Sequence, residues 1–203
     1  MLCSVAQARP PHLSAGADDA TVEALIRAAS AQIAALCGYP RASASAAPTM
    51  LSTEYTMILD CAGGRDLPLP LSPVTALGAI YDDPGGDFES ADLVTSTDYA
   101  LTYLPGKGWV ARLTRTATLG AWSRGRQCIR ATFTAGHVNP PDDLASLCVA
   151  LVRHQYEQRT ATRQESASVS GASYSFGEPA AVPDWIRHGL AVGGHILPRT
   201  VSA

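Results

Sequence analysis

The sequence predicts an α+β protein in which an antiparallel helical core carries an inserted small antiparallel β-domain. Two long stretches, near 19–37 and 141–159, repeat apolar residues at three- and four-residue spacing, as amphipathic helices do. Between them, residues 49–136 contain short β-type runs separated by glycine- and proline-rich turns. The β-domain is therefore predicted as an insertion between the two parts of the helical core, residues 18–40 and 139–160.

The first long helix follows residues 1–17, which show no sustained period and are predicted to form a flexible arm. Asp18 or Asp19 is suited to cap the start of the helix, and Gly38 followed by Pro40 supplies its end. The predicted apolar face consists of Val22, Leu25, Ile26, Ala29, Ile33 and Leu36.

Alanines lie off or beside this face, and three of them, Ala28, Ala31 and Ala35, are candidate contacts with another subunit. Small side chains allow a second helix to approach closely. Alanine is also the best helix former, so helix propensity alone explains the same composition. Both explanations remain open at this point.

The inserted domain is predicted to be a small antiparallel sheet or a partly open barrel. Its predicted strands are 54–59, 74–81, 99–104, 109–113 and 128–134, with a sixth strand possible. Turn signals separate them at Gly63-Gly64, Pro84-Gly85-Gly86 and Pro105-Gly106.

The second long helix follows a strand that ends at Gly136, and prolines at 140 and 141 precede two aspartates that suit the positive end of a helix dipole. Its predicted buried face consists of Leu144, Leu147, Cys148, Leu151, Val152 and Tyr156. On the polar face, Arg153, Glu157 and Arg159 are candidate contacts with the next copy.

The last segment, residues 160–203, is predicted to be a flexible linker and a docking segment. Eleven of the sixteen residues from 160 to 175 are Ser, Thr, Ala or Gly, which bury too little apolar surface to order themselves. Asp184 can cap a final short helix that Gly193-Gly194 ends. This helix either docks onto a partner or folds back onto its own core.

Charge is scarce and unevenly distributed. Charged residues make up 16% of the chain, against roughly 25% in ordinary soluble domains, and one interpretation is that much of the surface is buried against other subunits. Residues 1–100 carry 4 basic and 12 acidic side chains, whereas residues 101–203 carry 11 and 6. Basic residues between 101 and 130 are expected to contact either DNA phosphates or an acidic surface of a neighbouring protein. These residues are Lys107, Arg112, Arg115, Arg124 and Arg126.

Nothing in the sequence predicts a metal or a cofactor, and enzyme signatures are missing. Gly106-Lys107 is followed by glycine where a phosphate-binding loop needs Ser or Thr. The five cysteines form no CxxC pair, and no signal peptide or membrane span is evident, so a reduced, intracellular, soluble product is expected. A thiol enzyme using Cys128, which lies between Arg126 and Arg130, is the weaker alternative.

The chain resembles the head-to-tail adaptor (connector) proteins of long-tailed bacteriophages and gene transfer agents, because several of its motifs follow one another in the order found in that family. They are the first helix ending in CGYPR, LPLPLSPVTAL at 67–77 with the following YDD, FTAGHVNPPDDLASLCVALVRHQYEQR at 133–159, ESASVSGASYSF at 165–176, and PDWIRHGL. The resemblance covers roughly residues 18–192. The chain departs from the family at His137, where an aromatic residue often follows TAG, and at its end, which lacks a clearly basic helical tail.

The resemblance implies a structural virion protein, made in the host cytoplasm, that forms a homo-oligomeric ring, expected to be a dodecamer, in the neck below the portal vertex. The portal and a downstream neck or tail protein are its implied partners, and double-stranded DNA passes through the channel without sequence-specific contact. The portal-docking candidates are Tyr174, Phe176, Trp185, Ile186 and Leu190. A stopper or tail-completion protein is the alternative neck component.

Overall fold

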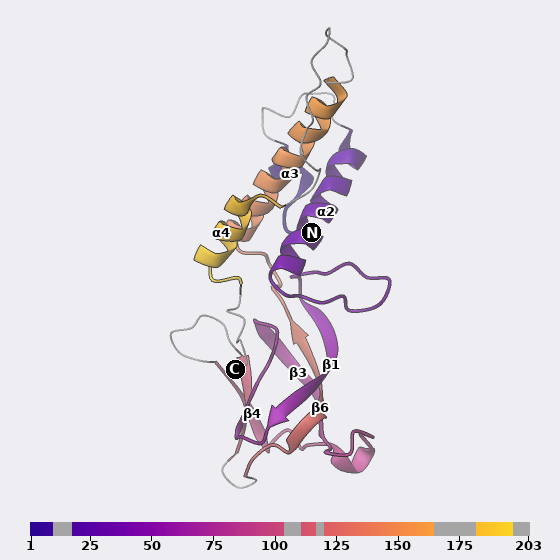
Figure 1. Cartoon of the computed structure of the whole chain (residues 1–203), viewed down its shortest axis with the longest axis vertical. Coiled ribbons are helices and arrows are strands. Elements are labelled where there is room, and N and C mark those ends of the chain that lie inside the picture. Colours follow the sequence, from indigo (N-terminus) through magenta and orange to yellow (C-terminus); the bar gives the residue numbers. More distant parts are fainter. Residues whose placement is uncertain (10–17, 104–110, 117–119, 165–181, 197–203) are drawn as a thin grey trace, which may run out of the picture. The chain divides into compact units, whose positions relative to one another are not determined.

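The protein folds into two compact units, which the computed structural model describes for residues 1–9, 18–103, 111–116, 120–164 and 182–196, without the side chains of residues 159–164 (Figure 1). The helical unit comprises Met1–Pro40, Ala47–Thr49 and Asn139–Ala203, and the β-unit comprises Arg41–Ala46 and Met50–Val138. In sequence, the β-unit therefore lies between two parts of the helical unit. The α+β class is confirmed.

The helical unit is built on α2 (Asp19–Leu36) and α3 (Asp142–Gln164), which lie side by side (Figure 1). The Asp18 side chain accepts a hydrogen bond from the Ala20 N–H and so caps α2. The Gln155 side-chain amide donates to the side-chain oxygen of Gln32 at 2.8 Å. The contact buries apolar residues at helical spacing on both helices, namely Val22, Ile26, Ala29, Ile33, Leu144, Cys148, Leu151 and Val152.

The predicted flexible arm is wrong for residues 1–9. Residues 5–8 form a short helix, α1 (Val5–Ala8), that contacts α2 and α3, and Leu2, Cys3 and Ala8 are buried. Ser4 and Gln7 form a capping box at its start. Four residues are too few to show a helical period, which is why the sequence did not reveal this helix. The rest of the predicted arm, residues 10–17, lies outside the described residues.

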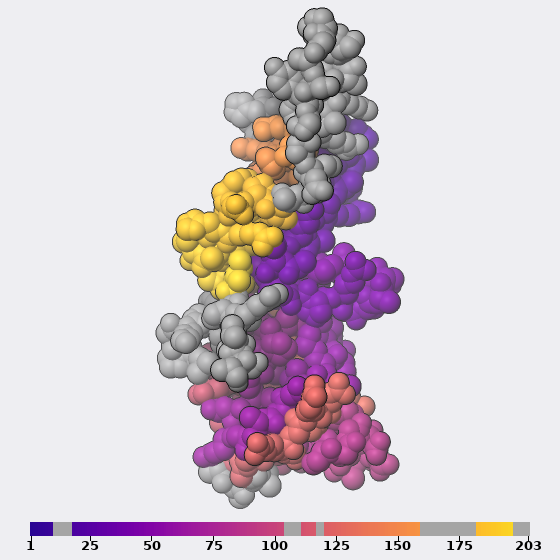
Figure 2. All heavy atoms as spheres, viewed as in Figure 1, coloured from indigo at the N-terminus to yellow at the C-terminus, as the bar shows by residue number. Residues whose placement is uncertain are grey.

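The last helix, α4 (Asp184–Val192), folds back onto α3, as the yellow and orange atoms of Figure 2 show. Pro183, rather than Asp184, occupies the capping position. Ile186 and Leu190, two of the portal-docking candidates, are fully buried, so the free subunit does not present them to a partner. Their spacing of four residues marks one apolar face, and that face covers the subunit's own core.

The β-unit consists of two three-stranded antiparallel sheets. In the first, β6 (Arg124–Ala135) lies between β1 (Thr53–Ala62) and β3 (Val74–Asp82). In the second, β5 (Ala111–Arg115) lies between β2 (Asp66–Pro68) and β4 (Tyr99–Tyr103). A 3-10 turn, η1 (Ser90–Asp92), separates β3 from β4.

An ion pair joins the two sheets. Arg115 on β5 contacts Asp82 on β3 at 2.5 Å, and the two side chains are only 10% and 8% exposed. The Arg115 guanidinium lies 4.3 Å from the ring centre of Trp122, and the indole N–H donates to the Leu113 carbonyl at 3.2 Å. We call Asp82, Arg115 and Trp122 the inter-sheet cluster. The Tyr103 hydroxyl adds a second link by donating to the Val74 carbonyl at 2.7 Å.

The strand β6 ends at a glycine that no other residue can replace without strain. Gly136 has a φ of 109°, and a Cβ built on it would lie 2.6 Å from the Leu51 carbonyl oxygen and 2.7 Å from that of Met50. We expect Gly136→Ala to lower the free energy of unfolding of the β-unit by about 2–5 kcal/mol, from the left-handed backbone and the backbone clash together. Urea denaturation followed by tryptophan fluorescence measures this change.

The control is Gly120→Ala, because Gly120 also has a positive φ of 75° but a Cβ there meets no described atom within 4 Å. It should cost about 1–2 kcal/mol, the backbone contribution alone. Equal losses in the two variants would show that the contact with Met50 and Leu51 has no energetic weight.

Candidate assembly interface

No three His, Cys, Asp or Glu side chains of the described residues gather where they could hold a metal ion, and none of the helices in this part of the chain is long and apolar enough to cross a membrane. Cys128 is completely buried, and this burial raises the pKa of its thiol. Its Sγ lies 3.4 Å from the Gly125 carbonyl oxygen, a structural contact. Burial and a raised pKa leave the Cys128 thiol poorly suited to act as an accessible nucleophile.

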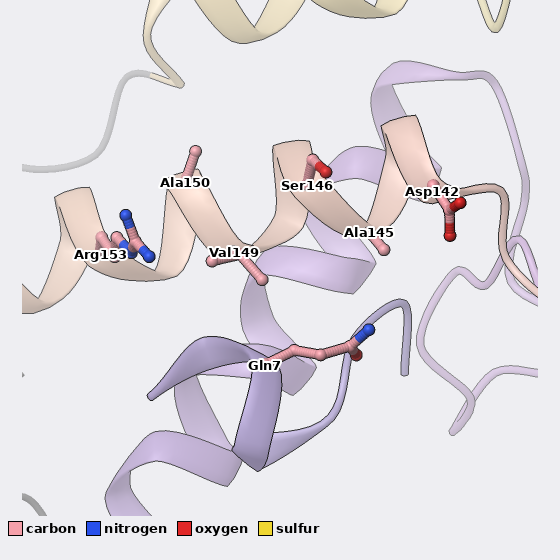
Figure 3. A pocket seen from close by; sticks show the side chains of 7 residues that line it. All are labelled: Gln7, Asp142, Ala145, Ser146, Val149, Ala150 and Arg153. Carbon is pink, nitrogen blue, oxygen red and sulfur yellow. The ribbon is translucent and has the colours of Figure 1, made fainter. Parts of the chain in front are cut away.

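A groove runs along one side of α3. It has a volume of about 470 Å³, and α1 forms its other wall through Gln7 (Figure 3). The residues that α3 contributes recur at spacings of three and four, so they form one stripe on the helix: Asp142, Ala145, Ser146, Val149, Ala150 and Arg153. We call this the α1–α3 groove.

The groove has small side chains along its floor and opposite charges at its two ends. Asp142 and Arg153 are eleven residues apart, which corresponds to about 16 Å along a helix. Arg153 Nε is buried without a hydrogen-bond partner among the described residues. A buried donor of this kind is costly until an acceptor reaches it. The groove therefore favours a partner segment that packs closely and brings an oxygen acceptor to Arg153.

The predicted subunit contacts lie on both long helices. Ala28 and Ala35 on α2 are exposed and Ala31 is half-buried. On α3, Arg153 lines the groove and Glu157 is exposed, whereas the Arg159 side chain lies outside the described part of the chain. The sequence interpretation missed Gln7, Asp142, Ala145 and Val149. The alanines and valine of α3 at three- and four-residue spacing were the available signal.

The predicted basic contacts separate into two groups. Arg112 pairs with Asp66 at 2.9 Å and Arg115 pairs with Asp82, so both serve contacts within the β-unit. Arg124 and Arg126 are exposed on β6, and neither forms an ion pair with a described residue. Lys107 lies outside the described residues. Among the described members of this set, Arg124 and Arg126 are therefore the two that no ion pair engages within the β-unit.

Of the predicted docking residues, Trp185 remains accessible. Its side chain is 46% exposed, and its ring meets the His154 ring edge-on with 6.4 Å between centroids. Tyr174 and Phe176 lie outside the described residues. An exposed tryptophan on a helix held by its other face is a suitable anchor for a partner.

The residues after α4 are held by an ion pair within the helical unit. His195 Nε2 lies 2.6 Å from Asp143 Oδ2. Partial burial raises the pKa of Asp143, but hydrogen bonds from the His195 ring and the Leu144 N–H outweigh it and hold the pKa below its usual value.

This depressed pKa predicts a loss of stability in acid. A carboxyl group whose pKa is lower in the folded state stabilises that state above its unfolded pKa, and the contribution is lost as pH falls through the folded pKa. We expect Asp143→Asn to flatten the dependence of the helical unit's melting temperature on pH below about 4. Wild type and variant are compared by thermal denaturation across pH. Identical profiles would contradict the role of Asp143.

One family model and several solved structures match this chain. The family model described as head completion protein matches residues 12–192. No curated protein matches the chain. One similar solved chain belongs to the neck of an empty GTA particle with C6 symmetry: it is 20% identical, with a TM-score of 0.60, over 100% of this chain and 93% of that chain.

A second similar chain comes from the virion of a native gene transfer agent (GTA) particle, with 22% identity and a TM-score of 0.59 over 100% of this chain and 93% of that one. A third comes from the neck of a native GTA particle with C12 symmetry, with 20% identity and a TM-score of 0.53 over 91% and 86%. At these identities the matches establish a shared fold.

Proposed function

This chain belongs to the head completion protein family, and from that membership we propose that it is a head-to-tail adaptor that forms a ring in the neck of a phage-like particle. The family comprises structural virion proteins rather than enzymes. The proposed position is between the portal and the downstream neck or tail protein, with double-stranded DNA passing through the channel. Likeness to chains from GTA necks with C6 and C12 symmetry supports a ring, and twelve copies are proposed.

The observation that carries the proposal is the α1–α3 groove. A ring needs two different complementary surfaces on each subunit, because each copy contacts the next head to tail. We infer that the groove is one surface and that the alanine stripe of α2 is the other. This stripe comprises Ala24, Ala28, Ala31 and Ala35, which recur at helical spacing on the side of α2 away from its buried residues.

The geometry of both surfaces supports the pairing. Alanines on the stripe and on the groove floor permit close approach of two helices, as small residues do elsewhere. Exposed Glu23 and Arg27, which pair with each other at 2.9 Å, lie on the same helix as the stripe. Glu23 offers an acceptor to Arg153 of the neighbouring groove, while Arg27 offers a cation to Asp142. In this arrangement the helical residues 18–40 and 139–160 form the ring, and residues 49–136 are an insertion.

Native mass spectrometry of the full chain with and without its portal protein tests the adaptor role. We expect a complex of portal with a closed ring of this protein. The free chain is expected to be smaller, because low charge and exposed alanine surfaces suit a subunit that assembles on a template. A protein that stays monomeric in the presence of portal would rule the adaptor role out.

The exposed arginines of β6 are proposed to face DNA. We expect particles with Arg124→Glu and Arg126→Glu to retain or eject their genome differently, because two cations that attract phosphates become anions that repel them. Packaged DNA is measured by quantitative PCR after nuclease treatment, and ejection is measured by dye release.

The matched control is Arg112→Gln, since Arg112 is already paired with Asp66. It should leave packaging and ejection unchanged. Normal packaging and ejection in the double variant would show that Arg124 and Arg126 do not meet DNA.

A further inference from the structure

Two cysteines from opposite ends of the sequence meet inside the helical unit. Cys3 precedes α1 and Cys148 lies on α3, yet their sulfur atoms are 3.5 Å apart. Both side chains are buried, with exposures of 6% and 0%. The Ser30 hydroxyl of α2 lies 3.6 Å from Cys148 Sγ, so three segments of the unit converge at this point.

We propose that Cys3 and Cys148 are a disulfide-forming pair, which closes when the reduced protein meets a small-molecule disulfide such as oxidised glutathione. The sulfur atoms need to approach by about 1.5 Å to reach the S–S bond length of about 2.0 Å. Rotation of the two side chains supplies a movement of this size. Local opening of the segment that carries Cys3, which packs on α2 and α3 through a helix of only four residues, gives the oxidant access. The pair is therefore close to bonding geometry before any oxidant arrives.

The reaction is two successive thiol–disulfide exchanges. Opening of residues 1–9 exposes Cys3, whose thiolate attacks the small disulfide and releases one small thiol. The Cys148 thiolate then attacks Cys3 Sγ and releases the second. Two protein thiols and one disulfide thus become one protein disulfide and two small thiols, so electrons and protons balance.

The environment of Cys148 fits its role as the attacking sulfur in the second exchange. In the reduced protein, hydrogen bonds from the Cys3 thiol and the Ser30 hydroxyl lower the pKa of Cys148 despite its burial. Once Cys3 carries the small thiol it has no S–H to donate, and the Ser30 hydroxyl, 3.6 Å from Cys148 Sγ, is the contact that still favours the Cys148 thiolate. The same contact with Cys148, together with burial, raises the pKa of Cys3. Cys37 has no such setting, because burial raises the pKa of its thiol to about 12.

The bond would lock one wall of the α1–α3 groove. Gln7 lies on α1 directly after the Cys3 segment, and Val149 follows Cys148 on α3. The link joins residues 145 positions apart, so it also removes much of the freedom of the unfolded chain. Extracellular particles are an oxidising setting in which such bonds persist. The effect on assembly rests on the proposed function, whereas the cross-link itself does not.

Disulfide mapping of the reduced full-length protein tests the pair. The protein is incubated under native conditions with oxidised glutathione, alkylated in denaturant, digested without reductant and analysed by mass spectrometry. We expect a peptide in which Cys3 is linked to Cys148, with the loss of two hydrogen atoms, and a rise in the melting temperature on the order of 10 °C. Reductant should reverse both changes.

Two variants sharpen the result. Cys3→Ser should lose the linked peptide and the rise in melting temperature, while Cys37→Ser should retain both. If a variant fails to fold, the disulfide map of the wild-type protein decides the test by itself. Alkylated Cys3 and Cys148 after the incubation, or glutathione left on Cys3 without transfer to Cys148, would overturn the proposal. A map in which the only disulfide joins other cysteines would overturn it as well. None of these outcomes bears on ring assembly.

Discussion

Replacing Asp82 with alanine is expected to lower the free energy of unfolding of the β-unit by about 3–5 kcal/mol. The substitution removes the only carboxylate that pairs with Arg115 among the described residues and leaves a cation whose side chain is 10% exposed. It also removes the acceptor of the Ser123 N–H, which lies 3.3 Å from both carboxylate oxygens. Urea denaturation with tryptophan fluorescence measures the loss, and Trp122 of the inter-sheet cluster reports on the contact itself.

Asp66→Ala is the matched control for this prediction. Asp66 also pairs with an arginine of β5, Arg112, at 2.9 Å, but these side chains are 30% and 45% exposed. The loss should be about 0–1 kcal/mol, because solvent screens the pair and hydrates the remaining arginine. Similar losses for Asp82→Ala and Asp66→Ala would contradict the conclusion that burial makes the inter-sheet pair important.

Val149→Glu is expected to prevent ring assembly while leaving the folded subunit intact. Val149 lies in the middle of the α1–α3 groove, four residues before Arg153. A glutamate there fills the groove, pairs with Arg153 along the helix and must lose its water when a neighbouring helix docks. The Kd of the subunit contact should rise at least about tenfold. Native mass spectrometry in the presence of portal measures ring formation, and circular dichroism verifies the fold.

Val138→Glu provides the control with the same change of side chain. Val138 is 73% exposed and lies outside the groove, so its variant should assemble like wild type. Normal rings from Val149→Glu would show that the groove is not a subunit contact, even if the protein remains an adaptor. A failure of both variants would indicate a general effect of added charge.

The long elements could be predicted because burial imposes a period on their residues. Val22, Ile26, Ala29 and Ile33 show the buried face of α2, and α3 begins after two prolines with two aspartates in its first turn, as the sequence indicated. The strand β2 escaped prediction because its three residues lie among prolines, where neither alternation nor β-propensity is visible.

The assignment of surfaces was harder, because a single apolar face does not say what covers it. Ile186 and Leu190 were interpreted as a partner surface, yet α3 of the same subunit covers them. The basic residues posed a similar problem. The acidic partners of Arg112 and Arg115 lie 46 and 33 positions earlier in the sequence, and only the fold brings them together.

The β-unit begins and ends on neighbouring strands. Thr53 of β1 pairs with Ala135 of β6, and the Ser52 N–H donates to the His137 carbonyl at 3.0 Å. The two points at which the chain enters and leaves this unit are therefore adjacent, as in segments that tolerate transplantation into a host protein. A single recombination event that exchanges the β-unit between relatives would change the surface that this unit presents. The sequence of the helical unit would stay the same.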